Sequence, residues 1–115
     1  MSSLSLPDGF QVTVFTLKTC KHCVKAKALL NSIQIPYVEI YVSNSKYRER
    51  MTTLVPSAQT VPQIFVMNEH IGGCDSLLEK MKRNEFIPLL EKLLKSFVSD
   101  ANVSTNVLSP LLRLN

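Results

Sequence analysis

The sequence has no tryptophan, only three glycines and only three cysteines among its 115 residues. Three cysteines are too few for the disulfide framework that stabilises small secreted domains. The hydrophobic fraction of 45% is that of an ordinary globular chain, which excludes the disordered and collagen-like classes. A chain of this length therefore predicts one domain with its own hydrophobic core.

Long hydrophobic runs are also absent. The most apolar stretch, 86–94, is interrupted by Pro88, Glu91 and Lys92 and is shorter than the roughly 20 residues that cross a bilayer. The first ten residues have neither the basic start nor the apolar centre of a secretory signal. We therefore expect no membrane partner and a cytoplasmic location, where cysteines stay reduced unless they have a redox function or bind metal.

Acidic residues are fewer than basic ones, 9 against 13, which gives a formal net charge of +4. Four of the basic residues are close together in the sequence: Lys18, Lys21, Lys25 and Lys27. This cluster predicts a preference for an anionic partner around residue 20. It is less dense than a nucleic-acid-binding arm, so we expect no nucleic-acid partner.

The hydrophobic periodicity predicts the element order β-α-β-α-β-β-α-α. The expected strands are 11–17, 37–42, 63–67 and 71–73, and the expected helices are 21–32, 46–54, 75–82 and 86–97. The polar cluster 43–45 is expected to cap the second helix, and Asp75 the third. We expect residues 1–10 to be an N-terminal extension, 11–98 the domain, and 99–115 a flexible C-terminal tail.

A CxxC motif, Cys20 to Cys23, stands where the first expected strand passes into the first helix. Unpaired N–H groups at the helix start favour negative charge on Cys20. Lys18, Lys21 and a protonated His22 add to this effect. We therefore predict a nucleophilic thiolate at Cys20 and a resolving thiol at Cys23, which closes an intramolecular disulfide.

The same motif is also half of a zinc site, and two cysteines can be inert buried thiols. Zinc needs two more ligands. The remaining candidates, Cys74, His70 and His22, form no second CxxC or HxxxH pair. The spacing therefore favours redox chemistry, and we predict no metal ligands.

Two further segments are candidates for ligand binding. A cis bond between Val61 and Pro62 would turn the backbone toward the thiols, although trans is the ordinary form. The segment 72–75, Gly-Gly-Cys-Asp, allows close backbone approach to a ligand carboxylate at a helix start, with Asp75 available for an ammonium group. A plain turn with Asp75 as the helix cap explains this segment equally well.

Other polar or reactive side chains are given simpler interpretations. Cys74 is interpreted as a small buried side chain. His70 is expected in the hairpin turn, facing solvent, and Arg48 and Arg50 on a solvated helix face. We assign no role to these three residues.

Three motifs, in this order, resemble those of glutaredoxins. They are Lys18 two residues before the CxxC, Thr60-Val61-Pro62-Gln63-Ile64-Phe65, and His70-Ile71-Gly72-Gly73-Cys74-Asp75-Ser76-Leu77. The resemblance covers residues 12–94. It implies an α/β thioredoxin fold, with a four-stranded mixed sheet flanked by helices, and a cis bond before Pro62.

The resemblance also implies roles for individual residues. Cys20 would form the mixed disulfide with glutathione and Cys23 would resolve it. Val61 would pair with the cysteinyl part through its backbone, and Lys18 would face the glycine carboxylate. The full glutathione-binding set that it implies is Lys18, His22, Gln59, Thr60, Val61, Pro62, Cys74 and Asp75.

The implied function is that of a monomeric glutathione-dependent thiol-disulfide oxidoreductase. Its partners would be glutathione as co-substrate, disulfide-containing or glutathionylated proteins, and indirectly glutathione reductase. Many dithiol glutaredoxins carry Pro and Tyr where this chain has Lys21 and His22. In this family, active sites without that proline can also hold a [2Fe–2S] cluster between two subunits with glutathione as a ligand, so an iron–sulfur carrier or sensor dimer is one alternative. A redoxin reduced by thioredoxin reductase is another.

Overall fold

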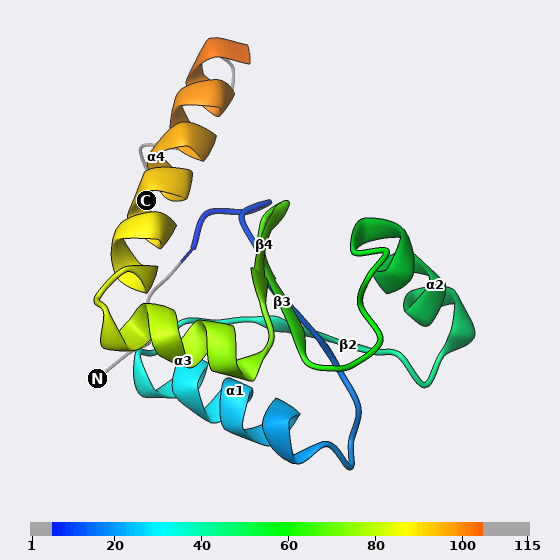
Figure 1. The fold of residues 1–115 in the computed structure, drawn as a ribbon. Coiled ribbons are helices and arrows are strands. Elements are labelled where there is room, and N and C mark those ends of the chain that lie inside the picture. Colours follow the sequence, from blue (N-terminus) through cyan, green and yellow to red (C-terminus); the bar gives the residue numbers. More distant parts are fainter. Residues whose placement is uncertain (1–5, 105–115) are drawn as a thin grey trace.

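The computed structural model describes residues 6–104. Its elements follow the predicted order (Figure 1). They are β1 (Val12–Thr16), α1 (Lys21–Ser32), β2 (Val38–Tyr41), α2 (Ser45–Leu54), β3 (Gln63–Val66), β4 (Glu69–Gly72), α3 (Cys74–Lys82) and α4 (Phe86–Ser104). Asn44 caps α2, accepting hydrogen bonds from the Lys46 and Tyr47 amides, as the polar cluster 43–45 predicted.

The four strands form one mixed sheet in the order β2-β1-β3-β4. β1 pairs in parallel with β2 and antiparallel with β3, and β3 pairs antiparallel with β4. β1 is buried along its whole length because it lies inside the sheet and both of its faces are covered. The predicted thioredoxin-type sheet is therefore confirmed. The edge strand β2 is partly open, since Val38 is 43% exposed.

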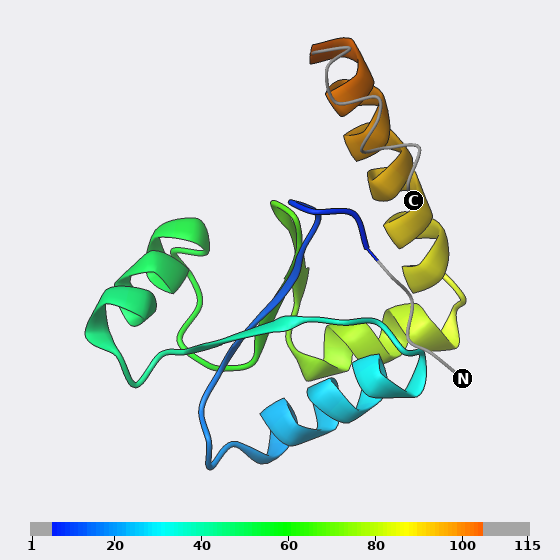
Figure 2. The same ribbon diagram turned by 180° about the vertical axis from the view of Figure 1, so that it is seen from behind.

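Helices cover both faces of the sheet (Figures 1 and 2). The larger hydrophobic cluster lies between the sheet and α1, α3 and α4, and its members include Val14, Leu30, Leu77 and Phe86. The smaller cluster lies on the other face beneath α2 and is built from Phe15, Val42, Met51, Ala58 and Phe65. None of the helices within residues 6–104 has both the length and the apolar character needed to span a membrane.

The two ends of the described chain differ from the expected limits. Phe10, in the expected N-terminal extension, is buried and contacts Phe97 edge-to-face with ring centroids 5.5 Å apart. α4 runs to Ser104 instead of Phe97 and projects beyond the sheet (Figure 1). No glycine or proline interrupts residues 98–104, so a helix already formed continues through this segment. The rest of the expected tail, 105–115, lies outside the described residues.

Candidate active site

Cys20 is the N-cap residue of α1, with an extended backbone at φ −94° and ψ 117°. Its Sγ accepts a hydrogen bond from the Cys23 amide at 3.1 Å. Its thiol also lies 3.5 Å from the carbonyl oxygen of Val61, to which it donates. The side chain is half-buried, so it remains accessible to a substrate. An amide aimed at the sulfur from a helix start stabilises negative charge there.

Cys23 is fully buried in the first turn of α1. Burial raises the pKa of the Cys23 thiol above its usual 9.0, and its contact with the Cys20 thiol raises the pKa further. Thr16, at the end of β1, opposes this by a hydrogen bond that favours the thiolate. The two cysteines therefore differ in access: one thiol faces the surface and the other lies behind it.

The Val61–Pro62 peptide bond is cis, which confirms what the resemblance implied. Pro62 is buried, and Val61 packs against the smaller hydrophobic cluster. A Cβ atom added to Gly73 would lie 3.4 Å from the Pro62 carbonyl oxygen. The loop before β3 therefore lies against the start of α3.

A groove of about 300 Å³ runs between the start of α1, the loop before β3 and the start of α3. Its lining residues are His22, Thr60, Val61, Pro62, Gly73, Cys74, Asp75 and Ser76. The fold thus brings six of the expected glutathione-binding residues to one groove. Lys18 and Gln59 are exposed and are not among its lining residues.

The start of α3 differs from the prediction that Asp75 caps it. The N-cap is Gly73, with φ −91° and ψ −164°, and no side chain bonds the first amides of this helix. Asp75 lies in the first turn and is exposed, so its carboxylate faces the positive end of the helix dipole without capping it. The prediction was wrong because Gly73 adopts the extended cap conformation two residues earlier.

Gly72 has a structural reason to be glycine. Its φ is +118°, and an added Cβ would lie 2.7 Å from the Ser76 Oγ. A side chain at this position would be both strained and too close to the helix. Gly73 and Ser76, which line the groove, were missing from the expected set although the third motif contains both.

Cys74 is buried, as its interpretation as a small core residue predicted. Burial raises the pKa of its thiol above 9.0, Lys25 on α1 opposes the rise, and Asp75 adds to it.

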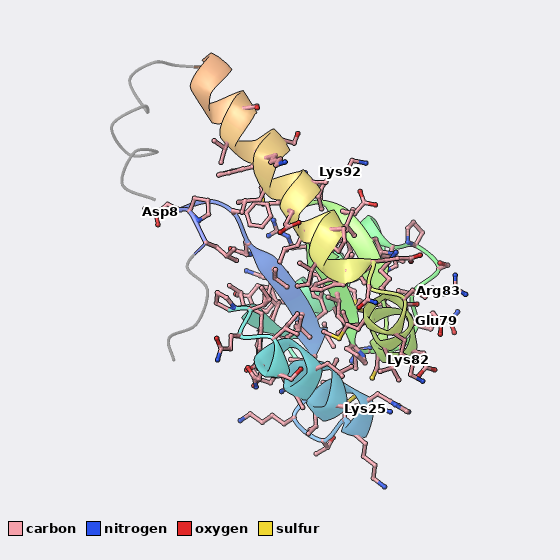
Figure 3. The ribbon with its side chains drawn as sticks, turned by 90° about the vertical axis from the view of Figure 1, so that its left-hand side faces the viewer. Asp8, Lys25, Glu79, Lys82, Arg83 and Lys92 are labelled. Atoms are coloured by element: carbon pink, nitrogen blue, oxygen red, sulfur yellow. The ribbon has the colours of Figure 1, made fainter. Side chains whose placement is uncertain are left out.

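Lys25 and Lys82, on the outer surface of α1 and α3, are labelled in Figure 3, where Arg83 lies beside Glu79. In the described part of the chain, no three His, Cys, Asp or Glu side chains are grouped so as to hold a metal ion.

Comparison with known proteins agrees with this geometry. The family model described as Glutaredoxin matches residues 12–71. Glutaredoxin 1 of Rickettsia conorii is 44% identical over 82 residues, which cover 70% of this chain and 80% of the relative. Glutaredoxin 3 of Escherichia coli strain K12 is 41% identical over 81 residues, covering 70% of this chain and 96% of the relative.

Solved structures give the same result. The crystal structure of a buckwheat glutaredoxin-glutathione complex superposes with a TM-score of 0.66 at 26% identity, covering 74% of this chain and 80% of the other. The family match extends over more than half of the 115 residues, and relatives at 41–44% identity cover 70% of the chain. The chain therefore belongs to the glutaredoxin family of thiol-disulfide oxidoreductases.

Proposed function

We propose that this oxidoreductase depends on glutathione and reduces protein-glutathione mixed disulfides, with Cys20 as the nucleophile. The observation that carries this proposal is the position of the Cys20 sulfur. It is half-buried, it accepts a hydrogen bond from the Cys23 amide, and it contacts the carbonyl oxygen of Val61, a residue that lines the ligand-sized groove.

The reaction proceeds by two thiol-disulfide exchanges. The Cys20 thiolate attacks the glutathione sulfur of the mixed disulfide, a Cys20–glutathione disulfide forms, and the substrate protein leaves as a thiolate that takes up a proton. The thiolate of a second glutathione then attacks the glutathione sulfur held on Cys20. Glutathione disulfide is released and the Cys20 thiolate is restored. Glutathione reductase returns the disulfide to two glutathione molecules at the expense of NADPH.

A second route uses both cysteines and acts on protein disulfides. Cys20 attacks one sulfur of the substrate disulfide to form a mixed disulfide. Cys23 then loses its proton and attacks the Cys20 sulfur, so the substrate leaves fully reduced and a Cys20–Cys23 disulfide remains. The Cys23 thiol already contacts the Cys20 thiol, so the first turn of α1 brings the two sulfurs into reach of one another. Two glutathione molecules reduce the new disulfide.

We assign the groove to the tripeptide. The Val61 backbone pairs with the cysteinyl part, which places the ligand sulfur beside Cys20. The start of α3 receives the γ-glutamyl end, because its uncapped first amides attract a carboxylate and Asp75 attracts the ammonium group. His22, Thr60, Pro62 and Cys74 form the remaining walls. The buckwheat relative named for its glutathione complex supports this assignment.

Two exposed residues outside the groove lining complete the assignment. Lys18 precedes Cys20 by two residues, and we assign it to the glycine carboxylate of glutathione, reached by its flexible side chain. Gln59, next to Thr60, adds a polar contact. Glutathione carries a net negative charge at neutral pH, which matches the basic cluster around residue 20.

Turnover of a glutathionylated peptide, coupled to NADPH through glutathione reductase, tests this function. The wild-type chain should turn over the peptide, and Cys20→Ser should lose about 1,000-fold or more of the rate, since serine is a far weaker nucleophile. Replacing glutathione and its reductase by thioredoxin reductase should give no turnover. A folded wild-type chain that is inactive with glutathione but active with thioredoxin reductase would contradict the proposal.

A further inference from the structure

A chain of hydrogen bonds links β4 to the loop that borders the groove. The Nε2 atom of His70 lies 2.7 Å from the Oε1 atom of Gln63. The Nε2 atom of Gln63 donates to the carbonyl oxygen of Thr60 at 3.0 Å. Gln63 is only 8% exposed, so both ends of its amide are satisfied within the protein and not by solvent. Sequence reasoning gave neither Gln63 nor His70 a role.

The direction of this chain follows from the Thr60 carbonyl, which can only accept a hydrogen bond. The amide nitrogen of Gln63 must therefore face Thr60, and its oxygen must face His70. The His70 Nε2 must then carry a hydrogen, which is true of one neutral tautomer and of the imidazolium. The contact is thus a donation from His70 in either charge state.

His70 is held in place although it is exposed. It lies opposite Phe65 in the β3·β4 ladder, and the two rings are 4.9 Å apart between centroids at an angle of 37°. Gln63 lies two residues before Phe65 on the same face of β3, so it is the diagonal neighbour of His70. One side of the imidazole ring therefore packs on Phe65, and its Nε2 end is bonded to Gln63.

We propose that Gln63 and His70 are positioning residues for the ligand-binding backbone. They hold the Thr60 carbonyl and, through it, the adjoining Val61 peptide, whose carbonyl contacts the Cys20 thiol. This inference rests on the proposed function, in which the Val61 backbone pairs with the cysteinyl part of glutathione. It assigns specificity for the tripeptide partly to residues that do not line the groove.

Loss of the donor should weaken ligand binding without slowing the chemistry. In His70→Phe the ring packing on Phe65 is kept and the donor is removed, so KM for a glutathionylated peptide should rise roughly 2- to 10-fold. The value of kcat should stay within about 2-fold, because the Cys23 amide that stabilises the Cys20 sulfur belongs to α1 and is unchanged. Gln63→Leu, which also leaves the Thr60 carbonyl without its donor, should raise KM at least as much.

His70→Gln provides the rescue. It restores an N–H donor at a reach similar to that of Nε2 and removes the aromatic ring, so its KM should return to within about 2-fold of wild type. Glu69→Gln, at an exposed neighbour on β4, is the matched control and should leave both constants unchanged. Far-UV circular dichroism of each variant checks folding. The exposed His70 variants keep the test valid if Gln63→Leu does not fold.

The amide resonance of Val61 in a ¹⁵N–¹H NMR spectrum gives a readout that does not depend on activity. It should shift in His70→Phe and return toward its wild-type position in His70→Gln. A wild-type KM in His70→Phe, a His70→Gln variant as impaired as His70→Phe, or a loss in kcat instead of KM would each overturn the inference. An inactive wild type would overturn the proposed function, and the Val61 resonance would still decide whether the hydrogen-bond chain holds the loop.

Discussion

Two helices begin at the groove, and a cysteine stands at the start of each. In α1 the cysteine is the N-cap residue, so the Cys20 sulfur lies over the first turn and accepts a hydrogen bond from the Cys23 amide. In α3 the N-cap is Gly73, and Cys74 is the first residue inside the helix. Cys74 is buried in the larger hydrophobic cluster, where burial raises the pKa of its thiol.

This difference of one position decides whether a thiol at a helix start can bond the free amides of the first turn. An N-cap side chain can bond the free amides of the first turn, whereas a side chain inside the helix points to a fixed face, which here is the core. At the start of α1, the Cys23 amide therefore bonds the sulfur of the cap residue, Cys20. α3 has no side-chain cap, so its amides remain available to a ligand at the groove.

The largest expected effect comes from separating the contribution of the Cys23 backbone amide from that of the Cys23 thiol. Cys23→Ser keeps the backbone amide that bonds Cys20 and removes the thiol to which we assign the resolving step. Deglutathionylation of a peptide should stay within about 3-fold of wild type, while reduction of a protein disulfide by the two-cysteine route should fall about 100-fold or more. Both rates can be measured in the assay coupled to glutathione reductase. Loss of both activities in a folded variant would contradict these roles.

A more direct test of the difference between the two helix starts gives α3 the side-chain cap that it lacks. Gly73 has a negative φ, and an added Cβ would meet only the Pro62 carbonyl, at the ordinary distance of 3.4 Å. Gly73→Asp should therefore fold and place a carboxylate over the first amides of α3, where we expect the ligand carboxylate. KM for the glutathionylated peptide should rise about 10-fold, while stability should increase by a few tenths of a kcal/mol.

Gly73→Ala is the matched control, because it adds a Cβ but neither charge nor cap. Its KM should stay within about 3-fold of wild type. Equal increases in KM for the alanine and aspartate variants would show that the space at Gly73, and not its free amides, matters for binding.

Much of this fold was predictable from local patterns. Residues 21–32 lack glycine and proline and carry apolar residues at helical spacing, and α1 has those bounds in the structure. The strands were predicted to within a few residues because β-branched runs and turn residues delimit them. The end of α4 was not predicted, since residues 98–104 mix polar residues with valine and alanine and nothing in them marks where a helix stops.

The candidate site was likewise predictable from local patterns only in part. The CxxC spacing alone indicated a redox pair at a helix start, since the amides of a first turn lie within reach of its cap residue. The groove depends on contacts distant in sequence, such as Cys20 with Val61, 41 positions apart. The roles of Gly73 and of His70 depend on backbone angles and on the β3·β4 register. No local pattern gives these values, and Asp75 was therefore misassigned as the cap.

The smallest expected effect concerns the buried thiol of Cys74 under reducing conditions. Its pKa in the folded chain is raised above 9.0, so the folded state holds this proton more tightly than the unfolded state. The resulting stabilisation is present below the unfolded-state pKa and is lost as the pH rises through the folded-state value. Between pH 7.5 and pH 10, the Tm of the wild type should therefore fall more than that of Cys74→Ala, by an extra few degrees at most.

Thermal unfolding followed by circular dichroism, with reductant present, measures this difference. Cys23 titrates in both proteins, so it cancels from the comparison. Iodoacetamide labelling at pH 7.5 provides the companion measurement: Cys20 should be alkylated in the folded chain, and Cys74 only after unfolding. Equal decreases in Tm together with rapid labelling of Cys74 would mean that the second helix start is as accessible as the first. The one-position offset would then not explain why we assign the nucleophile to Cys20 and not to Cys74.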